Sequence, residues 1–368
     1  MKDYAIGLIS SNYATDELDL LVKERNISTI PYAGRYRLVD FPLSNMVNSG
    51  LRTIGIITPY TYRSLIDHIG AGRNWFLDRS NGGLFILPGT IFGISNTKAR
   101  FLLRDINRNS IFMRRTPAPY VLITATSTVY NYDYNELIES HKNSGADITI
   151  LTHTTYEDDA NLSHAIINNE RVVALQNGVK KGDETFIDCF VINTNTLFDI
   201  INTYAAVDYQ DLFEAIQNDF NRYYIRAHHF NGYCQSFFTV KQYFENSMNL
   251  LDTEVYRELF RSDRPIMTKI HGTIPTKYET GCSVVNSLVQ EGSNISGSIE
   301  NSVIFRNVNV KKGARIKNCV IMQSCTIEEN TVLENAIIDR NNIITKGSTI
   351  KGSKQNPIIL EKKTEYKR

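Results

Sequence analysis

The chain has 368 residues, with 40 Lys and Arg residues against 39 Asp and Glu residues and a formal net charge of +1. This length suggests two domains and excludes a small disulfide-stapled fold. The near-zero charge gives no bulk electrostatic argument for binding nucleic acid or an anionic membrane. Five cysteines without a CxxC pair indicate neither a disulfide framework nor a zinc site. Since the apolar run near the N-terminus is too short for a signal segment or a membrane span, we expect a cytoplasmic protein with reduced thiols.

The first two thirds of the chain alternate short apolar runs with helix-like stretches. Runs rich in Ile, Val and Leu, typical of buried parallel strands, occur at 5–9, 54–58, 120–124 and 148–152. Apolar residues three or four apart predict helices at 42–49, 62–69 and 134–142. Later strands are expected at 172–175 and 186–193, and later helices at 196–204, 211–218 and 240–251. The alternation predicts βαβ units and a layered α/β domain over residues 1–255.

From Gly281 the sequence changes to small, polar and β-branched residues with an aliphatic residue about every six positions. This spacing links three series: Ile304, Val310 and Ile316; Ile327 and Leu333; Ile344 and Ile350. It is typical of a hexapeptide β-helix, in which each rung puts an aliphatic side chain into the axis of a triangular prism and needs stacked neighbours. We predict a helical linker at 256–280, a β-helix at 281–355 and a charged tail at 356–368. An irregular β-sandwich is the alternative.

The segment PYAGRYRLVDFPLSN at 31–45, followed by Val47 and by Asn48-Ser49-Gly50, strongly resembles the glycogen-type ADP-glucose pyrophosphorylases, the glucose-1-phosphate adenylyltransferases. The likeness continues through 58–60 and 64–72 and includes 285–297, so it covers essentially the whole chain. The resemblance implies a nucleotidyltransferase-like (Rossmann-like) α/β domain followed by a C-terminal left-handed parallel β-helix. It also implies formation of ADP-glucose and pyrophosphate from ATP and glucose 1-phosphate, with Mg²⁺, in glycogen synthesis.

That reaction needs a glycine-rich loop near the phosphates, a basic residue on them and two carboxylates on the metal. The family's first strand is followed by a Gly-Gly-x-Gly-Thr-Arg-Leu type loop. Here residues 10–17 read SSNYATDE, which contains no glycine and ends in two acids. The family's lysine after this loop, which neutralises phosphate, falls on Ile27. The resemblance therefore implies that the phosphate-binding elements are lost.

Both metal carboxylates of the family are replaced as well. The aspartate that ends the family's third strand corresponds to Ser127, and the aspartate before a long helix corresponds to Ser236. The nucleotide-lining Gly-Thr-Ala-Asp-Ala segment falls on the bulky residues 101–105, and the Glu-Lys-Pro motif is missing around 175–178. A serine hydroxyl is a poor ligand for Mg²⁺. We therefore expect no catalytic residue, cofactor or metal site in this chain, with Mg²⁺ bound in a catalytic partner.

An intact scaffold with an emptied site resembles the non-catalytic subunit that some bacteria pair with the catalytic ADP-glucose pyrophosphorylase in a mixed tetramer. The resemblance implies a regulatory subunit in glycogen biosynthesis that activates its catalytic partner through their interface. We expect the β-helix and the preserved residues 41–50 to support this assembly.

Arg35 and Arg37 are the candidates for binding a sugar-phosphate effector. Arg35 replaces a lysine that contributes to an anionic effector site between the domains of catalytic relatives, and arginine binds phosphate bidentately. An ion pair with Asp40 or a subunit contact is the structural alternative. His68 is predicted to be a packed, hydrogen-bonded core histidine. The basic residues at 98–115, Arg100 among them, are assigned to a solvated face or a subunit contact.

Three other functions remain open. The first is an active sugar-phosphate nucleotidyltransferase with relocated metal ligands, for which Asp133 and Asp188 are candidates. The second is a free-standing sugar-phosphate sensor. The third, a hexapeptide-repeat acyltransferase, is disfavoured because such enzymes usually place a catalytic histidine on the β-helix and no histidine follows His271.

Overall fold

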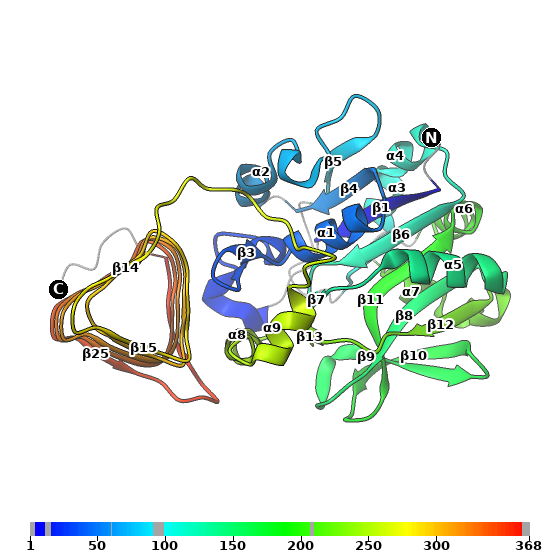
Figure 1. Ribbon diagram of the computed structural model, residues 1–368. Helices are drawn as coiled ribbons and strands as arrows, with labels where there is room; N and C mark the ends of the chain where they lie inside the picture. The colour runs from blue at the N-terminus through cyan, green and yellow to red at the C-terminus, as the bar shows by residue number, and fades with distance from the viewer. Residues whose placement is uncertain (1–3, 12–15, 60, 91–98, 207–209, 363–368) are drawn as a thin grey trace.

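The computed structural model describes residues 4–11, 16–59, 61–90, 99–206 and 210–362. An α/β unit occupies one side of the molecule and a triangular prism of stacked strands the other, as Figure 1 shows. In the described residues the α/β unit is built on a nine-stranded sheet of order β5-β4-β1-β6-β11-β8-β12-β10-β9. Its strands are β1 (Ala5–Ser10), β4 (Thr53–Thr58), β5 (Gly83–Pro88), β6 (Tyr120–Ala125), β8 (Ile148–Thr154), β9 (Asp159–Asn168), β10 (Arg171–Val179), β11 (Glu184–Asn193) and β12 (Ile225–His229).

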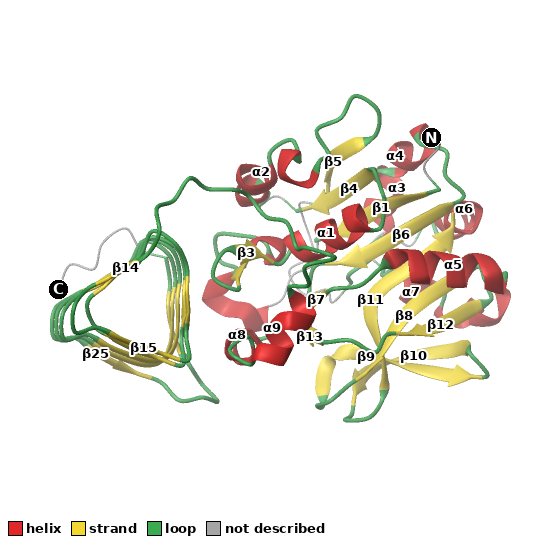
Figure 2. Cartoon of the chain, in the orientation of Figure 1, coloured by secondary structure: helices red, strands yellow, loops and turns green. Residues whose placement is uncertain are grey.

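Helices cover both faces of this sheet (Figure 2). They are α1 (Asp40–Asn48), α2 (Arg63–Ile69), α3 (Leu103–Arg108), α4 (Ser110–Arg115), α5 (Tyr134–Ser144), α6 (Thr194–Thr203) and α7 (Leu212–Ala215). Helices α8 (Val240–Asn249) and α9 (Thr253–Leu259) instead pack in a cluster shared with the prism. Single 3₁₀ turns or short 3₁₀ helices lie at η1 (Asp16–Leu21), η2 (Ile27–Thr29), η3 (Arg73–Trp75) and η4 (Gln217–Arg222).

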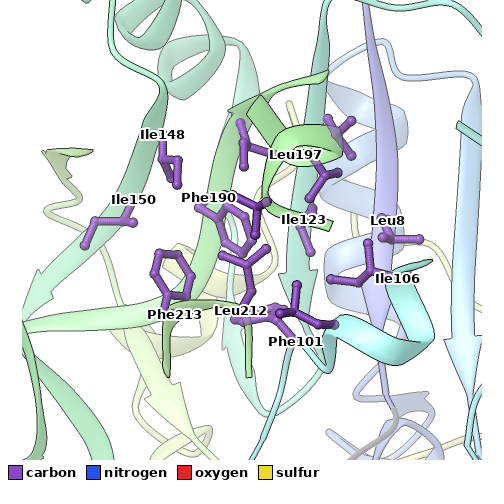
Figure 3. Packing of buried hydrophobic residues seen from close by; sticks show 14 of the residues in the cluster. Leu8, Phe101, Ile106, Ile123, Ile148, Ile150, Phe190, Leu197, Leu212 and Phe213 are labelled. Carbon is purple, nitrogen blue, oxygen red and sulfur yellow. The ribbon is translucent and has the colours of Figure 1, made fainter. Parts of the chain in front are cut away.

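Successive residues of a strand point to opposite faces, which divides the core of the α/β unit into two apolar layers. Leu8 and Ile123 pack with α3, α4, α6 and α7 on one face, in the cluster of Figure 3 that includes Phe101 and Phe190. Ile9 and Leu122 pack with α1, α2 and α5 on the other face. Burial on both faces explains the continuous apolar runs of these strands.

The four strands predicted to be parallel all run in one direction. β4, β1 and β6 are adjacent and parallel, and β8 shares their direction because β11 runs antiparallel to both β6 and β8. The antiparallel β11 and the β9–β10 hairpin were not expected from the βαβ pattern. The prediction of a helical linker at 256–280 was wrong in its helical content, because α9 ends at Leu259 and residues 260–276 contain neither helix nor strand.

The prism consists of short parallel strands that stack coil upon coil. They are β14 (Lys277–Tyr278), β15 (Ser283–Val285), β16 (Leu288–Val289), β17 (Asn294–Ile295), β18 (Ser298–Glu300), β19 (Val303–Ile304), β20 (Asn309–Val310), β21 (Arg315–Ile321), β22 (Thr326–Ile327), β23 (Val332–Ile338), β24 (Ile343–Ile344), β25 (Thr349–Lys351) and β26 (Ile358–Leu360). Ile316 pairs with Leu333, which pairs with Ile350 on the next coil. The hexapeptide spacing therefore predicted a parallel β-helix correctly, with its aliphatic residues inside the prism.

One outer face of the prism is also apolar and packs against the α/β unit. Val320 and Ile337 alternate with inward residues, and they share a buried cluster with Ile27 and Phe41. Side chains of the same coil therefore serve two cores, one inside the prism and one between the two units. None of the helices in the described residues is both long and apolar enough to cross a membrane.

Leu333 gives a direct test of the inward stacking. It is fully buried inside the prism, whereas Ile343 is 47% exposed. We expect Leu333→Ala to lower the free energy of unfolding by about 2–5 kcal/mol, because it leaves a cavity in the stack. The matched Ile343→Ala variant should change it by less than about 0.5 kcal/mol in urea unfolding. Equal losses for both variants would contradict the inward stacking.

Candidate functional site

The carboxyl ends of β1, β4 and β6 meet at one edge of the sheet, where open α/β sheets bind their ligands. β1 ends at Ser10 and β6 ends at Ala125. A short antiparallel ribbon of β7 (Thr128–Tyr130) and β13 (Cys234–Ser236) lies directly after β6. We call this edge of the sheet, from the strand ends to the β7–β13 ribbon, the cleft.

The β7–β13 ribbon brings Ser127 and Ser236 together from distant parts of the sequence. Ser236 pairs with Thr128, and the backbone N–H of Phe237 donates to the carbonyl of Ser127 over 2.7 Å. Both serine side chains are buried. Two hydroxyl-bearing residues therefore lie at the positions where the resemblance placed two carboxylates.

A buried carboxylate, that of Asp188, lies beside Ser127. Asp188 sits at an irregularity in β11 and has a φ of 56°. Aspartate is among the residues that tolerate this left-handed conformation. The carboxylate accepts hydrogen bonds from Ser127 Oγ at 3.3 Å and from Arg100 Nη1 at 3.1 Å. The Nε of Arg100 lies 3.0 Å from its second oxygen, so the guanidinium binds both oxygens of Asp188.

Arg100 is fixed on several sides. Its guanidinium also donates to the carbonyl of Asn161 and stands 4.7 Å from the ring centroid of Phe238, two residues after Ser236. Its carbonyl accepts from Ser10 Oγ at the end of β1, and its backbone N–H donates to Asp211 over 3.0 Å. Only 12% of its side chain is exposed. Arg100 therefore fills the space between the end of β1, the middle of β11 and the segment that follows β13.

The electrostatics of this ion pair follow from its burial. Loss of water around Asp188 raises the pKa of its carboxyl to about 6, while the Arg100 guanidinium opposes that rise. A buried carboxylate needs a cation and hydrogen bonds to remain ionised. Arg100 supplies the cation, and Ser127 supplies a further hydrogen bond.

These residues do not fit a divalent cation. Mg²⁺ prefers carboxylate oxygens, whereas Ser127 and Ser236 offer neutral hydroxyls and both oxygens of Asp188 are bound by Arg100. The carboxylate of Asp133 lies 3.1 Å from Arg264 and also caps α5. In the ranges that the structure describes, no group of three or more His, Cys, Asp or Glu side chains is placed to hold a metal ion.

A second site lies between the α/β unit and the prism. It is a cavity of about 280 Å³ whose lining includes one acidic residue, Asp67, and six basic residues: Arg35, Arg37, His68, Lys269, His271 and Arg306. We call it the basic cavity. The predicted candidates Arg35 and Arg37 both line it. The Arg37 guanidinium donates to the carbonyl and the hydroxyl of Ser64 over 2.6 and 2.9 Å.

Asp40 is held from two directions next to this cavity. It accepts from the backbone N–H of Arg37 over 3.0 Å and lies 2.6 Å from His68 Nε2. The prediction that His68 is a buried, hydrogen-bonded residue is confirmed. The guanidinium of Arg37 donates to Ser64, whereas the backbone N–H of Arg37 donates to Asp40. The Asp40 carboxylate is therefore bound by that N–H and by His68.

The positive charges in and around the basic cavity repel one another. Burial lowers the pKa of Arg37 to about 10, Asp40 opposes this, and the guanidinium groups of Arg340, Arg25 and Arg306 lower the pKa further. Burial, together with the positive charges of Arg306 and Lys269, lowers the pKa of His271 to about 4. An anion in this cavity would relieve the repulsion among these groups.

The chain matches two family models, and over nearly its whole length it is similar to several known proteins. Residues 21–172 match the family model "Nucleotidyl transferase", and residues 273–356 match "GlmU-like, C-terminal hexapeptide". The chain is 33% identical to the glycogen biosynthesis protein GlgD of Geobacillus stearothermophilus over 364 residues, which cover 99% of this chain and 98% of that protein. It is 31% identical to GlgD of Bacillus subtilis (strain 168), covering 97% of this chain and 95% of the relative. It is 32% identical to the glucose-1-phosphate adenylyltransferase of Clostridium perfringens (strain 13 / Type A), covering 98% and 94%.

The chain belongs to the family of GlgD and glucose-1-phosphate adenylyltransferase. That Ser127, Ser236 and Ile27 replace functional positions of this family remains a prediction. Ile27 is buried in the cluster between the two units, and Arg25, close to it in sequence, binds Asp339 of the prism. Residues 12–15 of the expected phosphate loop lie outside the described residues. Phe101 packs into the core, as does Leu103, so this segment is filled by its own side chains.

Two expectations about side chains were wrong. Arg100 was assigned to a solvated face or a subunit contact, but it is largely buried on Asp188. The residues 41–50 were expected to support assembly, but Phe41, Leu43 and Met46 are fully buried inside the chain. Their apolar character therefore serves the chain's own core.

Sequence reasoning also missed Lys269, His271 and Arg306 as partners of Arg35 and Arg37. They reach the basic cavity only because the linker and the prism fold back against the α/β unit. Their spacing in the sequence carries no signal of this contact.

A double-mutant cycle tests the ion pair in the cleft. Arg100→Met and Asp188→Asn should each lower the free energy of unfolding by about 3–5 kcal/mol, because each leaves a buried charge without its partner. The double variant should lose less than the sum by more than about 1 kcal/mol. The exposed pair Arg261 and Asp263 is the control, and its variants Arg261→Met and Asp263→Asn should change stability little. Additive losses at Arg100 and Asp188 would contradict a direct pair.

Proposed function

We propose that this chain is a non-catalytic regulatory subunit of a glucose-1-phosphate adenylyltransferase in glycogen biosynthesis. It would activate a catalytic partner subunit within a mixed tetramer. The names of the GlgD relatives support a role in glycogen biosynthesis. The observation that carries the non-catalytic part is the Arg100–Asp188 pair, which fills the cleft beside Ser127.

The chemistry of the reaction explains why this filling matters. Transfer of an adenylyl group depends on positioning the phosphates and neutralising their charge. In this chain the carboxylate that bonds Ser127, that of Asp188, is paired with Arg100. The basic residue near Ile27, Arg25, faces Asp339 of the prism. The cleft thus offers no free carboxylate for a metal among these residues.

The rival function is an active nucleotidyltransferase with relocated ligands. Its two candidates, Asp133 and Asp188, are both engaged by arginines, at 3.1 Å from Arg264 and 3.0 Å from Arg100. Activity would require both ion pairs to open in a buried or half-buried setting. This cost favours the regulatory subunit.

We further propose that the basic cavity binds a sugar-phosphate effector through Arg35 and Arg37, joined by Arg306, Lys269 and His271. Arginine forks suit phosphate oxygens, and the lining joins three arginines and Lys269 to a single acidic residue, Asp67, which favours an anion. A free-standing sugar-phosphate sensor would use the same cavity without any partner. The two functions differ only in whether a catalytic subunit is bound.

Two finer statements belong to the same proposal. We propose that the protein acts in the cytoplasm, where its cysteines stay reduced; all five are free in the structure. We also propose that the β-helix winds left-handed, as the family resemblance implies.

A three-way assay tests the regulatory function. Pyrophosphate release from ATP and glucose 1-phosphate with Mg²⁺ is compared for this chain, for a catalytic homologue from the same cell and for the two co-expressed. We expect no turnover by this chain alone and a raised rate or altered saturation in the mixture. Turnover by this chain alone that is abolished by chelating Mg²⁺ would contradict the proposal. Failure of the two chains to co-purify would favour the sensor.

The effector site has its own test. Inorganic phosphate should bind the full chain, and Arg35→Met or Arg306→Met should weaken binding by about tenfold or more, because each removes a charge-assisted hydrogen-bond donor. Arg73, whose side chain is 89% exposed, provides the matched control Arg73→Met. Titration calorimetry measures the affinities. Equal affinity for all four proteins would contradict a phosphate site in the basic cavity.

A further inference from the structure

Three consecutive residues connect the N-terminal segment to the prism through ion pairs. Lys23 pairs with Glu361 at 2.7 Å and Glu24 pairs with Lys362 at 3.0 Å. Arg25 pairs with Asp339 at 2.5 Å. The first two pairs are exposed to solvent, whereas the side chains of Arg25 and Asp339 are only 3% and 2% exposed. The buried pair is therefore the contact whose electrostatics respond most to a nearby charge.

Arg25 of this pair lies near the basic cavity. Arg25 Nη1 lies 3.8 Å from the sulfur of Met322, which directly precedes the cavity residues Gln323 and Ser324. The backbone N–H of Arg340 donates to Asp339 over 2.6 Å. The guanidinium of Arg25 is also among the charges that lower the pKa of the cavity residue Arg37. A charge placed in the basic cavity therefore changes the electrostatic energy of the Arg25 guanidinium.

The other end of the pair reaches the edge of the cleft. Asn26, next to Arg25, donates from its side-chain amide to Thr58 Oγ1 over 2.9 Å, at the end of β4. Ser28 donates in turn to Asn26, and the backbone N–H of Val39 donates to the carbonyl of Ser28 over 2.9 Å. Residues 25–28 therefore bridge the prism, the strand end beside the cleft and the chain that leads into α1.

We infer that Arg25 and Asp339 are positioning residues that couple anion binding in the basic cavity to the backbone of residues 16–29 at the edge of the cleft. This inference rests on the effector site proposed above. An anion in the cavity competes with the Asp339 carboxylate for the positive charge of Arg25. The buried pair then shifts, and the Asn26–Thr58 contact shifts with it, through a contiguous set of hydrogen bonds.

Single variants confound this test, because Arg25→Met alone or Asp339→Asn alone leaves a buried charge unpaired and can prevent folding. The double variant Arg25→Met/Asp339→Leu removes both charges and keeps apolar volume. Such replacements of a buried ion pair are often neutral or stabilising. The control is the exposed pair, changed as Lys23→Met/Glu361→Gln, which links the same two segments without burial.

The experiment measures hydrogen–deuterium exchange of the full chain with and without saturating inorganic phosphate, alongside its phosphate affinity. We expect phosphate to change the exchange rates of amides in residues 16–29 by at least threefold in the wild type and in the exposed-pair control. In the double variant we expect phosphate affinity within about threefold of wild type and no change at residues 16–29.

Two outcomes would overturn the inference while leaving the effector site intact. One is phosphate binding to the wild type without a response at residues 16–29. The other is a full response in the folded double variant. Absence of phosphate binding to the wild type would instead contradict the proposed effector site, and the coupling with it.

Discussion

Asp188 is buried at the irregularity of β11, and a buried carboxylate must be protonated or paired with a cation. The pairing group in this chain is Arg100, which is held in place by Asn161, Phe238 and Ser10. This ion pair determines which group occupies the cleft. A cation that belongs to the protein occupies the neighbourhood of Ser127, and a metal ion with its phosphates would have to displace it at the cost of a buried unpaired charge.

The remainder of the α/β unit keeps the architecture of a nucleotidyltransferase. Parallel strands still end at one edge, and helices still cover both faces. The prism is attached by an apolar outer face that includes Val320 and Ile337, together with the ion pairs of residues 23–25. The regulatory function proposed above requires these surfaces and the basic cavity, and it does not require catalytic carboxylates.

Local patterns were sufficient to predict much of this fold. The apolar runs at 5–9 and 120–124 have few alternative structures, and six-residue spacing such as that of Ile304 and Val310 is specific for stacked coils. The antiparallel direction of β11 was not predictable, because its apolar run reads like that of a parallel strand. The direction of a buried strand depends on how the chain connects it to its neighbours in the sheet, and the local amino-acid composition carries no information about that path.

The candidate sites were predicted less completely than the fold. Arg35 and Arg37 lie in a preserved motif and could be singled out, whereas Arg306 and Lys269 join them only through tertiary folding. The partnership of Arg100 with Asp188 likewise spans 88 positions of the sequence and has no local signature. Ion pairs of this kind depend on burial, and burial of an arginine is contrary to its usual preference.

The most direct measurement of the central claim is calorimetric titration of the isolated chain with ATP, in the presence and in the absence of Mg²⁺. A cleft filled by Arg100 and Asp188 predicts no Mg²⁺-dependent binding at millimolar ATP. Micromolar binding that requires Mg²⁺ and disappears in Asp188→Asn would contradict the claim, because it would require Asp188 to leave Arg100 and ligate the metal.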